Sequence, residues 1–308
     1  MNFKGAKYLV LIVIVVMGAL HSYAQQHIMY TQYMFNGLAI NPAYAGSHED
    51  LNVTALVREQ WAGLKGAPST QTLAAHGPLK NNQAGIGGVF LHDQVGVTNE
   101  YGFYGSYAYK ITMEKGTISM GLQVGFTSYK ENLNDLLLQT RPAPDFQDHK
   151  SAFLPNFGAG IFYSSERFYV GFSIPRMLQN NLDKDNVTTV AKEIRHYFLT
   201  GGYVFDLNSA LRLKPNFLVK VVQGAPVQVD LNANLLIHDI IWVGISHRSM
   251  ADWAALLEIQ INPKFRLGYS YDFVNTTELS KVQAGSHELM VSYNFSRPER
   301  KIKTPRFF

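Results

Sequence analysis

The chain has 308 residues, of which 46% are hydrophobic and only 16% are charged, and its formal net charge is +4. A water-soluble domain usually has about a quarter of its residues charged, so this composition favours a large apolar exterior. The absence of cysteine excludes disulfides, thiolate metal sites and lipid attachment to an N-terminal cysteine.

Residues 1–24 have the pattern of a secretory signal peptide. Lys4 and Lys7 precede the apolar run Tyr8–Leu20, and a small-x-small cleavage motif ends at Ala24. The apolar run is too short for a membrane-spanning helix, which needs about 20 residues. We therefore expect cleavage near Ala24 and export across the inner membrane, with an uncleaved anchor as the alternative.

Residues 25–50 form an N-terminal segment that precedes the first strand and contains the stretch "NGLAINPAYAG" (36–46). Pro42 and Gly46 break it, so it is neither a long helix nor a strand, yet its apolar groups need burial. Since the segment follows the signal peptide, we expect it to start on the periplasmic side. Two placements remain open. Residues 28–46 plug the lower barrel lumen, with Tyr44 inside and Arg58 or Gln60 nearby, or the segment binds another periplasmic protein.

From residue 51 onward the dominant signal is the alternation of apolar and polar residues. In "ADWAALLEIQIN" (251–262), Trp253, Leu257 and Ile261 face one way and Glu258 faces the other. Successive side chains of a strand point to opposite faces, so each such run predicts a strand with one apolar face. About fourteen runs follow this pattern, with approximate spans 51–60, 69–78, 83–91, 99–111, 116–129, 153–163, 166–175, 193–205, 210–222, 226–237, 239–247, 251–261, 263–274 and 285–295.

The runs predict an all-β outer-membrane barrel over residues 51–295 rather than a soluble sandwich. Most are longer than the roughly 5 to 6 residues of a soluble strand. Connections after even-numbered runs are short, and most of those after odd-numbered runs are longer, including 130–152 and 176–192. An even number of antiparallel strands, with short periplasmic turns and longer extracellular loops, is typical of such barrels. Aromatic residues near run ends predict interfacial girdles: Trp253, Tyr271, Phe273, Tyr293 and Phe295.

Several residues raise questions that the strand pattern leaves open. Pro215 lies inside a run and lacks a ladder donor, so we expect a bulge or a strand end there. Leu136, Leu137 and Leu138 lie in an outward loop, where they form a partner patch or fold over the barrel mouth. By parity, eight charged residues point into the lumen, where they form an ion-pair network, line a pore or hold a plug: Arg58, Arg212, Lys214, Lys220, Asp230, Glu258, Arg266 and Asp272.

No arrangement of residues indicates catalysis. His92, His149 and His247 fall in predicted loops without the spacing of a metal site, and there is no phosphate-binding loop or nucleophile elbow. We therefore predict no enzymatic activity, no cofactor and no metal, with a barrel-embedded hydrolase as the only enzymatic alternative. The basic excess does not indicate nucleic-acid binding, because it lies in the tail 296–308, at Arg297, Arg300, Lys301, Lys303 and Arg306.

Four stretches together resemble one family. They are "NPAYAG" (41–46), "REQWAGLKGAP" (58–68), "GIGGVFLHDQVG" (85–96) and "GSHELMVSYNF" (285–295). Their order and spacing, over essentially the whole mature chain, resemble the PorP/SprF family of type IX secretion system outer-membrane proteins. The residues that carry the resemblance or its last-strand assembly signal are Asn41, Pro42, Tyr44, Gly46, Arg58, Gln60, Trp61, Tyr293 and Phe295.

The resemblance implies a component of the type IX secretion and gliding apparatus of Bacteroidota in the cell outer membrane. Such a component docks or anchors large adhesin-like exported proteins through their C-terminal domains and contacts ring or lipoprotein components in the periplasm. The basic tail 296–308 departs from the expected end of the barrel, and it either binds a ring component or is disordered. The alternative function is an outer-membrane porin or small-solute transporter, because fourteen strands can enclose a sizeable lumen.

Overall fold

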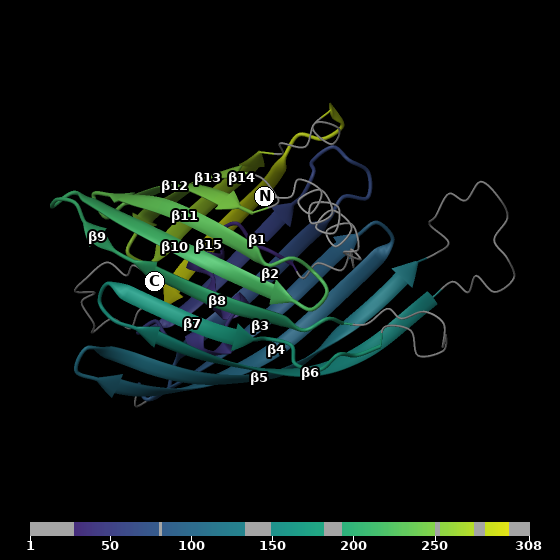
Figure 1. The fold of residues 1–308 in the computed structure, drawn as a ribbon, viewed down its shortest axis with the longest axis horizontal. Coiled ribbons are helices and arrows are strands. Elements are labelled where there is room, and N and C mark those ends of the chain that lie inside the picture. The colour runs from purple at the N-terminus through teal and green to yellow at the C-terminus, as the bar shows by residue number, and fades with distance from the viewer. Residues whose placement is uncertain are drawn as a thin grey trace, which may run out of the picture.

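The computed structural model describes residues 28–79, 82–132, 149–181, 193–249, 253–273 and 281–295. Its strands form one antiparallel sheet that closes into a barrel (Figure 1). Closure joins the first strand to the last, because β1 (Leu51–Glu59) pairs with β15 (Ser286–Phe295) along its whole length. The predicted outer-membrane barrel is confirmed.

The strands between these two follow one another around the barrel. They are β2 (Ser69–Pro78), β3 (Ala84–Val95), β4 (Thr98–Met113), β5 (Gly116–Asn132), β6 (His149–Ser164), β7 (Phe168–Ile174), β8 (His196–Tyr203), β9 (Phe205–Asp206), β10 (Leu211–Val222), β11 (Gln228–Ile237), β12 (Ile241–Arg248), β13 (Trp253–Asn262) and β14 (Phe265–Phe273).

The barrel has fourteen strand positions, because β8 and β9 are two parts of one strand. Both pair with β10, and the register is the same from Leu213↔Phe205 to Asn216↔Gly202. The break between them is at Val204, which the register places opposite Lys214, next to Pro215, which lies opposite Tyr203 and has no N–H to donate. The expected bulge or strand end at Pro215 is therefore wrong for its own strand: β10 continues through it, and the interruption falls on the neighbouring strand.

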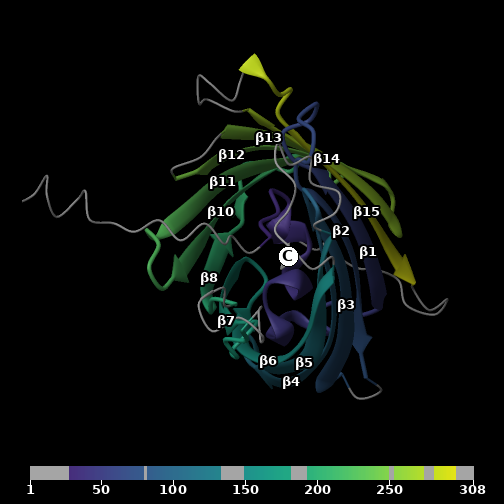
Figure 2. The ribbon, with the colours of Figure 1, turned by 90° about the vertical axis from the view of Figure 1, so that its right-hand side faces the viewer.

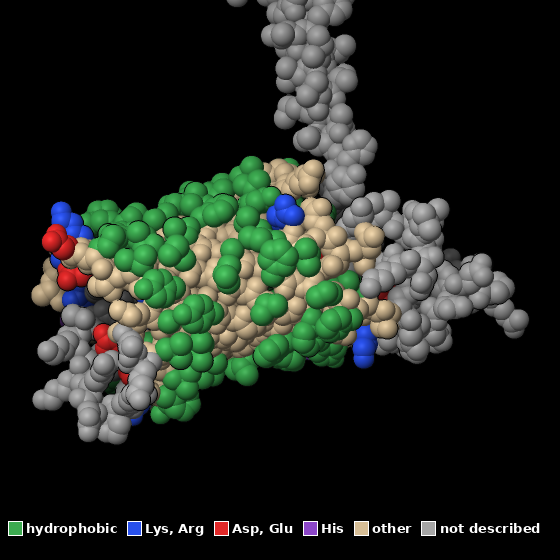
Figure 3. Space-filling model, turned by 90° about the horizontal axis from the view of Figure 1, so that it is seen from below, with side chains coloured by type: hydrophobic (Ala, Val, Ile, Leu, Met, Phe, Trp, Pro, Cys, Tyr) green, Lys and Arg blue, Asp and Glu red, His purple; other side chains and the backbone are tan. Residues whose placement is uncertain are grey.

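Alternate side chains face the outside and the lumen. On β13, the outward-facing Trp253 and Leu257 are 45% and 41% exposed. Glu258, which follows Leu257, points into the lumen and is fully buried. On the face that Figure 3 shows, hydrophobic side chains are spread along the whole length of the wall, and charged side chains gather mainly near one end. The hydrocarbon of a bilayer can contact this wall because closure pairs the strand backbones with one another.

The two ends of the barrel differ in their connections. At the periplasmic end the turns are short, as at His238 and Asp239, whose φ values of 50° and 57° form a tight turn that a hydrogen bond from the Ile240 N–H to the Ile237 carbonyl closes. The extracellular end has the longer connections, except that Val95 pairs with Thr98 across a tight turn. His92, His149 and His247 lie in β3, β6 and β12, contrary to the expectation that they lie in loops. None of the described residues belongs to a helix long and apolar enough to cross a membrane.

The lumen segment (residues 28–48) lies inside the barrel, as the view along the barrel shows (Figure 2). It forms three short 3₁₀ helices, η1 (Tyr33–Phe35), η2 (Gly37–Ala39) and η3 (Pro42–Tyr44). Pro42 starts η3, and the Asn41 side chain accepts a hydrogen bond from the Ala43 N–H at 2.9 Å, so Asn-Pro provides both the cap and the preset φ of a helical start. The hydrophobic core lies between this segment and the barrel wall.

Candidate functional site: the occupied lumen

A buried ionic cluster binds the amino-terminal part of the lumen segment. The Glu288 carboxylate accepts the backbone N–H of Thr31 at 2.9 Å and that of Gln32 at 2.7 Å. Arg58 donates to Glu288 at 3.1 Å and to Asp272 at 2.5 Å. The Thr31 hydroxyl donates to Asp272 at 2.8 Å and accepts from Arg58 at 3.0 Å. We call Arg58, Asp272 and Glu288 the Arg58 cluster.

The Arg58 cluster spans the strands that close the barrel. Arg58 is on β1, Glu288 is its register partner on β15, and Asp272 is on the adjacent β14. All three side chains are buried, at 10% exposure or less. Buried charges are stable only when they are paired and hydrogen-bonded. The segment completes that pairing, so it is bound directly across the seam between the first and last strands.

Tyr30 anchors the same end of the segment to two further strands. Its hydroxyl is 2.6 Å from the Thr72 hydroxyl, and burial raises the pKa of Tyr30 above its usual value. Arg248 donates to the Tyr30 carbonyl at 3.4 Å and also to Asp230 at 2.9 Å. These lumen charges therefore form ion pairs with one another and also bind the segment. The expected ion-pair network and the expected contact with a plug occur together.

A buried lysine contacts the middle of the segment. Lys214 is fully buried, and its Nζ lies 5.5 Å from the ring centre of Phe35 in the segment. The Tyr169 and Trp242 rings of the wall lie 5.6 and 5.7 Å from the same nitrogen. Three ring faces near one ammonium give a cation–π site, which is stronger where water is excluded. Lys214 thereby joins the segment to the wall.

The carboxyl-terminal part of the segment packs directly against glycines of the wall. A Cβ added to Gly121 would lie 2.2 Å from the Ala43 nitrogen, and one added to Gly85 would lie 2.3 Å from the Ala45 oxygen. No Cβ tolerates such distances, so backbone meets backbone at both places. Asn41 adds a hydrogen bond of 3.0 Å to the Ile161 carbonyl.

Tyr44 is 5% exposed and packs near the periplasmic end. Its ring lies edge-on to His76 and Phe162, at centroid distances of 5.3 and 5.4 Å. His76 pairs with Asn52 of β1, whereas Arg58 lies six residues further along that strand, or about 20 Å at roughly 3.3 Å per residue. The expected contact between Tyr44 and Arg58 is therefore wrong.

The segment starts in the extracellular half of the lumen and runs towards the periplasmic end. Thr31 contacts Glu288, the third residue of β15, at the extracellular end of that strand. Gly46 has a φ of 70° and turns the chain at the opposite end, where Lys110 donates to its carbonyl at 2.6 Å. The expectation that the segment starts on the periplasmic side is wrong, because its first contacts are with extracellular strand ends.

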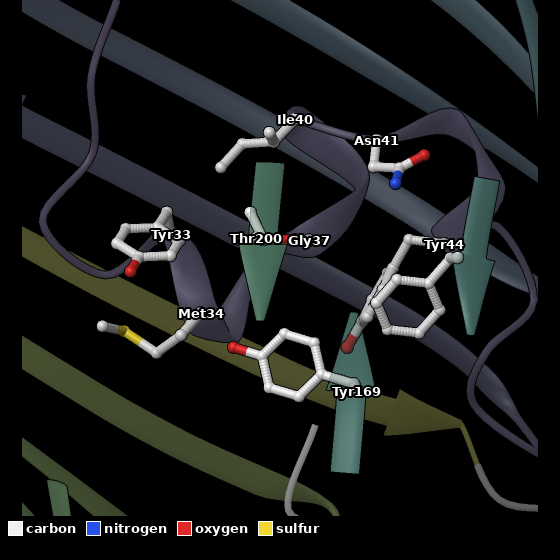
Figure 4. Close-up of a pocket in the computed structure, with 9 residues that line it drawn as sticks. Tyr33, Met34, Gly37, Ile40, Asn41, Tyr44, Tyr169 and Thr200 are labelled. Atoms are coloured by element: carbon white, nitrogen blue, oxygen red, sulfur yellow. The ribbon is translucent and has the colours of Figure 1, made fainter. Parts of the chain in front are cut away.

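A small cavity remains between the segment and the wall (Figure 4). Its volume of about 30 Å³ has room for about two water molecules. Aromatic rings form much of its lining, which comprises Tyr33, Met34, Gly37, Ile40, Asn41, Tyr44, Phe162, Tyr169 and Thr200. A solute larger than water would have to displace the lumen segment to use this space.

The connection after β7 also folds inward where the structure describes it. The Pro175 carbonyl accepts a hydrogen bond from Gln123 at 2.9 Å. Arg176 pairs with Glu100 at 2.9 Å and with Glu193 at 3.3 Å. Pro175 and Arg176 therefore contact side chains of β4 and β5 inside the barrel. Leu136, Leu137, Leu138 and the tail 296–308 lie outside the described residues.

Gln60 and Trp61 lie in the first extracellular loop, not in the lumen. This loop (residues 60–68) is hydrogen-bonded to its neighbours on both sides. Ala62 exchanges two backbone hydrogen bonds of 2.8 Å with residues 284 and 285, and Gly66 accepts one of 3.0 Å from Gly96. On the last strand, Tyr293 and Phe295 face outward at 37% and 52% exposure, and their role in assembly stays a prediction.

Sequence reasoning placed Arg58 and Asp272 in the lumen but missed their partners in the segment. Glu288 was available as a signal, since it lies on the polar face of the last predicted strand. The backbone N–H groups of Thr31 and Gln32 carry no sequence signal. Within the described part of the chain, no group of three or more His, Asp and Glu residues could hold a metal ion.

Solved structures with a similar fold are outer-membrane barrels. The CymD monoaromatic hydrocarbon channel matches with a TM-score of 0.52 and 11% identity, over 87% of this chain and 94% of that one. Omp33 of Acinetobacter baumannii matches with a TM-score of 0.48 and 10% identity, over 80% and 98% of the two chains. These likenesses concern the fold alone. A comparison with curated protein sequences gives no significant match.

The family comparison is specific where the structural one is not. The profile of the type IX secretion system membrane protein PorP/SprF matches residues 22–293. That range includes the lumen segment, the Arg58 cluster, the first three stretches on which the resemblance rests and all but the last two residues of the fourth. The chain belongs to the PorP/SprF family of type IX secretion system membrane proteins and is an outer-membrane β-barrel.

Proposed function

We propose that this barrel is a docking component of the type IX secretion system. On the extracellular side it anchors large, adhesin-like exported proteins through their C-terminal domains, and on the periplasmic side it contacts ring or lipoprotein components. The observation that carries this proposal is the occupied lumen. The chain's own segment is bound to the wall by charges at one end and by backbone packing at the other, as suits a scaffold rather than an open channel.

The first extracellular loop supports docking on the outside. Because residues 60–68 are hydrogen-bonded to both neighbouring connections, a partner that binds there orders few additional groups, which lowers the entropic cost of association. Leu64, Val95 and Val282 are exposed at this end of the barrel, at 36%, 45% and 58%. Exposed apolar groups on an ordered surface are typical of protein interfaces.

The periplasmic rim supports a contact of a different chemistry. Arg167 pairs with Asp206 at 2.5 Å, and Arg212 pairs with Asp206 at 3.1 Å and with Asp239. These pairs are partly exposed, so water and salt screen them and they contribute little to stability. A charged, hydrated rim suits a polar periplasmic partner, while the apolar wall between the two ends contacts outer-membrane lipid.

Deletion of the gene tests the docking role. We expect exported surface proteins to be released into the medium or degraded, while the permeability of the outer membrane to small dyes is unchanged. Complementation with Leu64→Glu should fail to restore surface display, whereas Leu207→Glu should restore it. Leu207 is the matched control, since it is an exposed leucine (56%) in a connection at the opposite end. Normal display in the deletion strain would contradict the proposal.

The competing function is passage of a small solute, as the name of the CymD channel describes for that protein. Conductance of the purified barrel in planar bilayers separates the two functions. Because the lumen segment packs against the wall and the cavity beside it has a volume of about 30 Å³, we expect no stable open conductance. A stable conductance in the unmodified protein would favour a porin or transporter instead.

A further inference from the structure

We propose that the chain enters the lumen from the extracellular mouth of the barrel, with Ile28 as the outermost described residue, whereas the barrel ends on the periplasmic side. Going back along the chain from β1, each contact of the lumen segment lies closer to the extracellular end. Gly46 contacts Lys110 near the periplasmic end of β4. Tyr30 contacts Arg248, the last residue of β12 at the extracellular end.

The chain beyond Tyr30 has no open path back to the periplasm. Ile28 and Met29 pack against the core cluster that Phe35 and Trp242 share below them. The Arg58 cluster fills the lumen beside Thr31 with buried, paired charges. A chain that returned downwards would have to displace both, so the remaining direction is towards the mouth.

The reach of the chain leads to the same conclusion. After cleavage at the expected site near Ala24, three residues precede Ile28. Three extended residues span at most about 11 Å. From Glu288 to Phe295, at the periplasmic end of β15, the strand advances seven residues, or about 23 Å at roughly 3.3 Å per residue. Three residues before Ile28 are therefore too few to reach the periplasmic end of the barrel.

This placement puts the amino-terminal end of the lumen segment, at Thr31, next to the strand end that leads into the first extracellular loop. Arg58, which contacts Thr31, is two residues before the start of loop 60–68. An extracellular partner of the loop can therefore also contact this end of the lumen segment. A periplasmic partner has access only to the other end of the lumen segment, where Glu49 and Asp50 lead into β1.

The absence of native cysteine makes a direct test possible, because a single introduced thiol is unique. The test variant is His27→Cys. Lys65→Cys in the first extracellular loop and Glu114→Cys in a periplasmic turn are the controls, since both residues are exposed. Each variant is treated with a membrane-impermeant maleimide on intact cells and again after permeabilisation, and the mass of the purified protein reports signal-peptide cleavage.

We expect His27→Cys to react on intact cells to the same extent as Lys65→Cys, while Glu114→Cys reacts at least tenfold more after permeabilisation than before. Reaction of His27→Cys only after permeabilisation would place the amino terminus in the periplasm and overturn the proposal. Reaction only after denaturation would place it inside the lumen, and retention of the signal peptide would remove the reach argument. Either result also overturns it.

Discussion

The two halves of the lumen bind the same segment by different means. In the extracellular half, Glu288 and Asp272 accept hydrogen bonds from Thr31 and Gln32, and Arg58 pairs with both carboxylates. In the periplasmic half, the segment's backbone lies directly against Gly121 and Gly85. One half depends on the identity of charged groups and the other on the absence of side chains.

This difference implies that the two ends of the segment respond to different changes. Charged contacts are directional, and removal of one partner leaves the other buried and unpaired. Backbone packing against glycine has no such partner, but a single added methyl group forces the neighbouring chain to move. Variants in one half should therefore loosen one end of the segment and leave the other in place.

The largest effect is expected for Glu288→Ala. It removes the acceptor of two backbone N–H groups and one partner of Arg58, so the free energy of unfolding should fall by about 3–5 kcal/mol. Urea unfolding of the purified barrel in detergent measures the change. Glu59→Ala is the control, because Glu59 is an exposed carboxylate near the same end of β1 and its loss should cost less than about 0.5 kcal/mol. Equal losses in the two variants would contradict a specific role for the cluster.

A smaller loss is expected for Gly121→Ala. The new Cβ would lie 2.2 Å from the Ala43 nitrogen, and overpacking of this kind typically costs about 1–3 kcal/mol. Gly105→Ala on the adjacent strand β4 is the control, since its nearest atom would be 3.9 Å away. If Gly121→Ala unfolds at the same urea concentration as Gly105→Ala, the segment is not packed against β5 as described.

Thiol accessibility distinguishes the two ends directly. Met29→Cys reports on the extracellular end of the segment and Ser47→Cys on the periplasmic end. In the Glu288→Ala background, maleimide should react faster with Cys at position 29 and at an unchanged rate at position 47. In the Gly121→Ala background the pattern should reverse. Parallel changes at both positions would mean that the segment moves as one unit.

The smallest effect is expected for Asn41→Ala, which removes the cap of η3 and the donor to Ile161. Loss of such a cap typically costs about 1 kcal/mol. Asn41→Ser separates the two contributions, because serine can still cap the helix but cannot reach the Ile161 carbonyl. We expect Asn41→Ser to unfold at a urea concentration between those of the unmodified protein and Asn41→Ala. A loss in Asn41→Ser equal to that in Asn41→Ala would show that the cap contributes nothing.

The barrel could be predicted because its wall has one chemistry throughout. Lipid requires an apolar side chain at every second position, so residues such as Trp253 and Leu257 mark both strand and face. The prediction was less accurate at the extracellular ends, where β3 and β4 continue as far as Val95 and Thr98. Polar residues occupy both faces there, and the alternation no longer distinguishes a strand from a loop.

The lumen segment could be predicted only in part. Parity placed Arg58 and Asp272 in the lumen, and the apolar groups near Tyr44 indicated burial. The direction of the segment could not be predicted, since its three 3₁₀ helices have no periodicity that identifies a face. Its partners also come from distant strands, as the 257 positions between Thr31 and Glu288 show. The need to bury the apolar groups of the segment can be read from the segment itself. The place where the segment binds depends on strands that come together only in the closed barrel.

The seam position of the Arg58 cluster also has a consequence for assembly. Glu288 lies on the last strand, so the site for Thr31 and Gln32 is incomplete until that strand joins β1. Thr31 and Gln32 therefore reach their final contacts only after the first and last strands have joined.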